Sequence, residues 1–125
     1  MDASVVGYAP PGKLASFAVD IDGDHQRIVP LKTKSKYQAE LAGIKYVCQS
    51  VINTDVDLNI KVTVSHISTI FIKNEDGSFP KRSKSQKLID EVRELSTKFS
   101  SFTCEANKDL EAVEVLKEKA KLASV

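Results

Sequence analysis

The chain has 125 residues, a length that fits one ordinary domain able to bury a hydrophobic core without disulfides or metals to hold it together. It carries 18 basic and 17 acidic residues, and the resulting net charge of +1 excludes binding to nucleic acid through a general positive field. Any such binding must depend on local clusters of lysine and arginine.

Three short strands are expected at the start of the chain. Residues Ser4–Ala9 have a β-prone composition, and Leu14–Ile21 alternates between two faces. Asp22 and Gly23 supply a hairpin signal before the next segment, Arg27–Leu31. The pattern predicts a three-stranded antiparallel meander.

An amphipathic helix is predicted over Ser35–Val51. Its apolar residues recur at the helical spacing of one buried stripe, formed by Tyr37, Leu41, Ile44, Cys48 and Val51. Glu40 lies at the margin of that stripe. A carboxylate there is either a boundary residue that pairs with Lys36 or Lys45 in water, or an acid held at the edge of the core for a purpose.

The middle of the chain contains one clear strand and one ambiguous segment. The alternation of Leu58–Ser65 predicts a half-buried strand. Residues Ile67–Lys73 fit either a short helix or an extended segment. The Asp, Gly, Ser, Pro and Lys residues of Asn74–Ser85 are typical of a loop.

The last part of the chain predicts a helix, a strand and a second helix. Apolar residues at helical spacing indicate a helix over Ser85–Lys98, and Phe99–Glu105 is expected to be a strand. The final helix is predicted from Lys108 to about residue 122, with Asn107 as its N-cap. Glu111 then lies in the first turn, where an acid interacts favourably with the helix dipole.

This order of elements predicts a single three-layer α/β domain over residues 1–125, with no internal repeat. The sheet is expected to be mixed and five-stranded, with a three-stranded antiparallel meander and two parallel strands. The strands beginning near Leu58 and Phe99 each follow a helix, as parallel additions to a sheet require. Helices should therefore cover both faces of the sheet.

Cysteine usage and hydropathy indicate the cellular environment. Cys48 and Cys104 are far apart in the chain and have no Cys or His partner at metal-ligand spacing, so we expect buried thiols in a reducing compartment. The purely apolar runs are only a few residues long, which argues against a signal peptide or a membrane span. We expect an intracellular soluble protein, cytoplasmic or nuclear, with no membrane partner.

Two segments, AELAGIKYVCQ from Ala39 and NKDLEAVEVLKEKAK from Asn107, resemble the ribonuclease H family. In that family a three-stranded meander leads into a helix with an A-E-x-x-A signature, and the last helix opens with an N-x-x-A-D motif. The resemblance extends over nearly the whole chain and implies a ribonuclease H-like fold. It also implies cleavage of RNA in RNA/DNA hybrids, with four carboxylates holding two Mg²⁺ or Mn²⁺ ions that stabilise the attacking and leaving oxygens.

Two of the four acids implied by the resemblance have counterparts in the chain. Glu40 matches the acid of the first helix. Glu111 matches the acid of the last helix, and Asp109 is a nearby substitute. Where the family has a Ser-Asp or Thr-Asp pair after the fourth strand, this chain has Ser65 and His66. An imidazole can ligate Mn²⁺ but suits Mg²⁺ poorly.

The first-strand acid depends on the register chosen. In one register Asp2 is that acid, but almost no chain precedes it to form the central strand. In the other, SVVGYA is the central strand and the place of the acid falls at Ala9. We favour the second register, because a sheet without its middle strand would expose its core. A site with half of its carboxylates would hold Mg²⁺ weakly, so we expect absent or weak catalysis.

Two basic clusters are candidates for contact with nucleic acid. The segment PKRSKSQK contributes Lys81, Arg82, Lys84 and Lys87, and LKTKSK contributes Lys32, Lys34 and Lys36. In the resembling family a basic loop or helix in about this region grips the hybrid. Ordinary solubilising lysines are the alternative interpretation. Few aromatic residues lie among them, so the sequence gives little support to stacking on single strands.

Three functions therefore follow as expectations. The first is a ribonuclease H-like domain that binds RNA/DNA hybrid or double-stranded RNA, with absent or weak nuclease activity. The second is an active Mg²⁺- or Mn²⁺-dependent ribonuclease H that uses Asp2, Glu40 and Glu111, helped by His66. The third is a non-catalytic scaffold for a protein partner, which an exposed apolar patch on the Leu88–Phe99 segment would favour.

Overall fold

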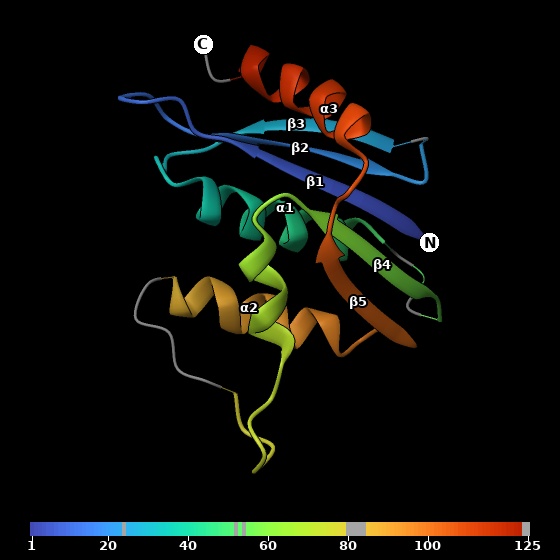
Figure 1. The fold of residues 1–125 in the computed structure, drawn as a ribbon. Coiled ribbons are helices and arrows are strands. Elements are labelled where there is room, and N and C mark those ends of the chain that lie inside the picture. The colour runs from blue at the N-terminus through green and yellow to red at the C-terminus, as the bar shows by residue number, and fades with distance from the viewer. Residues whose placement is uncertain (24, 52, 54, 80–84, 124–125) are drawn as a thin grey trace.

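The computed structural model describes residues 1–23, 25–51, 53, 55–79 and 85–123. These residues form a five-stranded mixed sheet with helices on both faces (Figure 1), which confirms the predicted α/β class. In chain order the elements are β1 (Asp2–Tyr8), β2 (Ser16–Ile21), β3 (His25–Pro30), α1 (Lys36–Ser50), β4 (Asp57–Val62), the 3₁₀ helix η1 (Ser65–Phe71), α2 (Gln86–Ser96), β5 (Ser101–Ala106) and α3 (Leu110–Ala123).

The strand order in the sheet is β3-β2-β1-β4-β5, which places β1 at the centre. The first three strands form the expected antiparallel meander, and β4 and β5 extend the sheet as parallel strands on the other side of β1. The helices α1 and α2 precede β4 and β5 and supply the crossovers that parallel pairing needs. The SVVGYA segment is therefore in the middle strand, as the favoured register requires.

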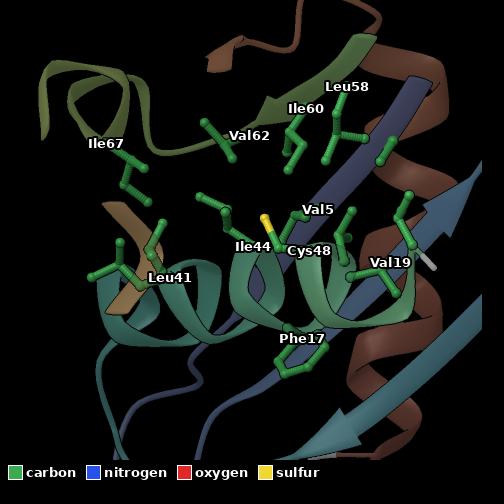
Figure 2. Packing of buried hydrophobic residues seen from close by; sticks show 14 of the residues in the cluster. Val5, Phe17, Val19, Leu41, Ile44, Cys48, Leu58, Ile60, Val62 and Ile67 are labelled. Atoms are coloured by element: carbon green, nitrogen blue, oxygen red, sulfur yellow. The ribbon is translucent and has the colours of Figure 1, made fainter. Parts of the chain in front are cut away.

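Different helices cover the two faces of the sheet. Val5 belongs to the main core cluster with Ile44 of α1 and Ile60 of β4, whose side chains point toward one another (Figure 2). The next residue, Val6, packs instead with Leu116 of α3. Because successive strand residues point to opposite faces, α1 and α3 lie on opposite sides of the sheet. Among the described helices, none has both the length and the apolar character that a bilayer crossing demands.

The sequence of α1 explains both its start and its orientation. The Ser35 side chain accepts a hydrogen bond from the Gln38 backbone N–H at 3.2 Å, the usual N-cap arrangement. The predicted stripe is confirmed, since Leu41 and Ile44 are fully buried and Cys48 nearly so. Burying this stripe against β1 and β2 fixes the helix on the sheet.

The strand β4 is shorter than the sequence predicted. The alternation suggested a strand through Ser65, but pairing with β1 and β5 ends at Val62. Beyond that point the backbone N–H groups of Thr63 and Val64 donate to the Glu40 carboxylate instead of to a neighbouring strand. The chain then turns into η1, so the ambiguous segment that follows is largely a 3₁₀ helix.

The N-cap predicted for the last helix was wrong by two residues. The helix α3 begins at Leu110, and the Asp109 carboxylate accepts a hydrogen bond from the Ala112 backbone N–H at 3.1 Å. Asn107 instead accepts one from the Asp109 backbone N–H at 3.0 Å, in a turn that precedes the helix. Asn and Asp are both favoured at the N-cap of a helix. The path of the chain after β5 places Asp109 at that position.

Both cysteines are free, with Cys48 buried and Cys104 partly buried. Burial raises the pKa of each thiol to about 12, which leaves very little thiolate near neutral pH. We therefore predict that both thiols react slowly with a disulfide reagent in the folded protein at about pH 8 and rapidly in urea. Timed absorbance of the released thiolate measures this, and fast reaction of a native thiol would contradict the burial described.

Candidate functional site

Glu40 lies at the carboxyl ends of β1 and β4, and its residue is fully buried. One carboxylate oxygen accepts hydrogen bonds from the backbone N–H groups of Thr63 and Val64, at 2.9 and 2.8 Å. The other accepts from the Gly7 backbone N–H at 2.9 Å and from the Thr63 hydroxyl. The Glu40 side chain therefore points toward the ends of β1 and β4. It does not reach water and does not pair with Lys36 or Lys45.

These contacts explain how the central pair of strands separates. The parallel register of β1 and β4 ends at Val5 and Val62. Past this point the N–H groups of Gly7, Thr63 and Val64 would lack strand partners, and the carboxylate supplies acceptors for them. An ionised carboxylate has about four acceptor positions, and four donors occupy them. In this arrangement Glu40 has no lone pair left for a metal ion.

Gly7 makes the approach of Glu40 to the strand sterically feasible. A Cβ atom built at this position would lie 2.8 Å from Cγ of Glu40 and 3.0 Å from the carbonyl oxygen of Lys36. Any side chain at position 7 would push the first turn of α1 away from β1. This role of Gly7 was not predicted, although a glycine inside a strand pattern is a sequence signal of close backbone approach.

The other predicted acids lie away from Glu40. Asp2 is at the opposite end of β1, about 16 Å from Gly7 at about 3.3 Å per residue. Its carboxylate accepts a hydrogen bond from the Asn59 amide at 3.3 Å. Glu111 is exposed in the first turn of α3, the helix on the other face of the sheet from α1. The structure thus separates the two best-matched acids.

Asp2 instead shares a pocket with Asp109, the substitute for the last-helix acid. The pocket has a volume of about 330 Å³ and lies between the sheet and the start of α3, lined by Asp2, Ala3, Ser4, Asn59, Lys61, Asn107, Asp109 and Ala112. Its lysine and two carboxylates provide fewer anionic ligands than a two-metal centre needs. Within the ranges that the structure describes, no three His, Cys, Asp or Glu side chains are grouped so that they could hold a metal ion.

His66 follows Val64, whose backbone N–H binds Glu40, by two residues, but it is used differently from a metal ligand. It is exposed in η1, and its ring stacks on Tyr37 of α1 with 5.1 Å between ring centroids and 6° between ring planes. This pair was missed because its members come from a helix and from the segment after a strand. Sequence spacing gives no signal that such residues meet.

The start of α1 lies next to the start of α2. The Gln38 amide donates a hydrogen bond to the Ser85 hydroxyl at 2.8 Å, which joins the two helix starts. Lys34 and Lys36 flank the start of α1, Lys87 is in the first turn of α2, and all three are exposed. The predicted contacts Lys81, Arg82 and Lys84 lie outside the described residues.

Arg93 is a buried cation that was not among the predicted site residues. Its Nε donates to the Ile70 carbonyl oxygen at 2.6 Å, and its guanidinium lies 4.3 Å from the centroid of the Phe79 ring. These two interactions attach the end of η1 and Phe79 to α2. Phe79 directly precedes the basic segment PKRSKSQK in the chain. Phe79 and Ser85, the described residues on either side of residues 80–84, contact Arg93 and Gln38, respectively.

Comparison of the chain with models of known protein families and with curated proteins found no match. The fold itself defines an α/β protein with a mixed sheet, an antiparallel meander on one side and parallel strands on the other. The likeness to ribonuclease H remains a resemblance of sequence segments and of the order of elements. What the chain does must be argued from its own side chains.

Proposed function

We propose that this chain is a ribonuclease H-like domain that binds nucleic acid, as RNA/DNA hybrid or double-stranded RNA, with absent or weak metal-dependent nuclease activity. The strand order supports the proposal, because a meander extended by two parallel strands with helices on both faces is what the resemblance implies. The position of Glu40 next to the ends of β1 and β4 supports it as well.

The observation that carries the binding proposal is the junction between the starts of α1 and α2, where Lys34, Lys36 and Lys87 are exposed. The bond from Gln38 to Ser85 brings together segments that are 47 residues apart in sequence. Lys34 and Lys36 are exposed there and form no ion pair with another described residue. Lysines without acidic partners can neutralise phosphates, and released counterions then favour the complex.

The use of Glu40 supports weak or absent cleavage. Phosphodiester hydrolysis by two metals needs several carboxylates that converge on both ions. Glu40 is instead saturated by backbone and hydroxyl donors, and Asp2 is at the far end of β1. An active Mg²⁺ or Mn²⁺ enzyme would first have to break these hydrogen bonds.

The structure does not show, anywhere in the fully described Leu88–Phe99 segment, the exposed apolar patch that would favour a scaffold function. Ile89 and Val92 are fully buried there and Phe99 is 8% exposed. Leu88 and Leu95 pack partly buried against the same core. The segment uses its apolar residues inside the domain.

Neutralising the lysines at the junction should weaken binding to nucleic acid. We predict that the Lys34→Gln, Lys36→Gln double variant binds a labelled RNA/DNA hybrid about tenfold more weakly than the unmodified protein at moderate salt. Its affinity should also fall less steeply as salt rises, because fewer counterions are released. Fluorescence anisotropy at several salt concentrations measures both quantities.

The matched control removes the same charge elsewhere. Lys98 follows the far end of α2 and Lys117 is in α3, so the Lys98→Gln, Lys117→Gln double variant should bind the hybrid nearly as well as the unmodified protein. Equal weakening by both pairs, or affinity that does not depend on salt, would refute the proposed surface.

A further inference from the structure

Tyr37 and His66 form an ordered aromatic pair beside the lysines at the start of α1. Their rings are nearly parallel, and the centroid distance of 5.1 Å is within the range of offset stacking. Tyr37 is partly buried and His66 is exposed. The imidazole forms no hydrogen bond with another described residue, so its position depends on the stack and on the backbone of η1.

The Glu40 carboxylate connects the backbone segments that carry the two rings. Glu40 follows Tyr37 by three residues on α1 and binds the Val64 backbone N–H, two residues before His66, at 2.8 Å. Ile67, the residue after His66, is fully buried and anchors η1 in the core. The rings are therefore preorganised, and a ligand that stacks on them would lose little of its binding energy to ordering side chains.

Two lysines lie close to Tyr37 in the chain, at the start of α1. Lys36 precedes Tyr37 directly in the chain, and Lys34 lies two residues earlier. Both lysines are exposed and have no acidic partner among the described residues. An aromatic surface flanked by cations suits a nucleotide, because the base stacks on the ring while the phosphate meets the ammonium groups.

We propose that Tyr37 and His66 form a stacking platform for one unpaired nucleobase, with Lys34 and Lys36 contacting the neighbouring phosphates. This inference rests on the proposed nucleic-acid function and narrows its ligand. The preferred partner is a duplex that continues into a single strand, because bases inside a duplex stack on each other and present no free face.

The test compares two probes with the full chain. The first is a blunt, labelled RNA/DNA hybrid, and the second is the same hybrid with a short single-stranded RNA extension that contains 2-aminopurine. We expect the extended probe to bind about tenfold more tightly than the blunt one, and its 2-aminopurine fluorescence to be quenched on binding.

Two substitutions at His66 test whether its ring is the surface on which the base stacks. His66→Ala should remove the preference for the extended probe and the quenching while leaving blunt-hybrid affinity within about twofold, because the phosphate contacts remain. His66→Phe keeps an aromatic face and should retain both effects. Thermal unfolding of each variant checks that the fold is intact.

The outcomes separate this inference from the proposed function. Salt-dependent binding of both probes with equal affinity and without quenching would overturn the platform and leave the nucleic-acid function standing. Quenching that persists in His66→Ala would also overturn it. If neither probe binds, both proposals are wrong.

Discussion

Replacing Glu40 by glutamine should lower the free energy of unfolding by about 3 kcal/mol, a large fraction of the stability of a small domain. The carboxylate accepts backbone N–H groups from Gly7, Thr63 and Val64 in a site closed to water. A glutamine amide has one acceptor oxygen, and its NH₂ group would face donors. At least one buried N–H would then have no partner.

The sign of the change in unfolding free energy distinguishes two roles for Glu40. In one, the carboxylate is a structural clamp that holds the ends of β1 and β4 together; in the other, it is an acid kept for a functional site. An acid kept at a functional site at some expense of stability often leaves the protein equally or more stable when it is neutralised. Urea denaturation with an unchanged slope measures the difference, and Glu114→Gln on the exposed side of α3 serves as the matched control. A Glu40→Gln protein as stable as the unmodified one would contradict the clamp.

The second large effect is expected at Gly43, in the middle of α1. Alanine normally stabilises a helix interior by about 1 kcal/mol relative to glycine. Here a Cβ atom would overlap Cγ1 of Val5 and press on the Phe17 ring at 3.4 Å. Because Val5 is stiff and fully buried, we predict that Gly43→Ala destabilises the protein by about 2 kcal/mol.

A double-mutant cycle tests the cause. In a Val5→Ala background the space above Gly43 is open, so Gly43→Ala should be far less harmful there, with a coupling energy of about 1 kcal/mol or more. Denaturant unfolding of the four proteins gives this value. A stabilising Gly43→Ala substitution in the unmodified background would show that α1 does not lie as close to β1 as described.

The parts of the fold that local pattern determines could be predicted from the sequence. The stripe of α1 and the alternation of β4 follow from the periods of helix and strand, and burial enforces them. The end of β4 could not be predicted, because Thr63 and Val64 continue its β-prone pattern. What stops the strand is a carboxylate from another element.

The candidate site was harder to predict than the fold, for a similar reason. The sequence places Glu40 at the margin of the apolar stripe, an unusual position for an acid. It does not show which hydrogen-bond donors surround the carboxylate in the folded protein. Nor could it show that Tyr37 and His66 stack, or that Gln38 reaches Ser85. Such contacts depend on how α1, η1 and α2 are packed, which periodicity does not encode.

A cleavage assay under binding conditions shows whether the domain binds nucleic acid while Glu40 serves only the fold. A labelled RNA/DNA hybrid is incubated with the protein in Mn²⁺ and in Mg²⁺, at concentrations where anisotropy shows the hybrid to be bound. We expect salt-sensitive binding and an RNA strand that stays largely intact. Metal-dependent cleavage that disappears in a folded, hybrid-binding Glu40→Gln protein would contradict this expectation, because Glu40 would then be a working metal ligand.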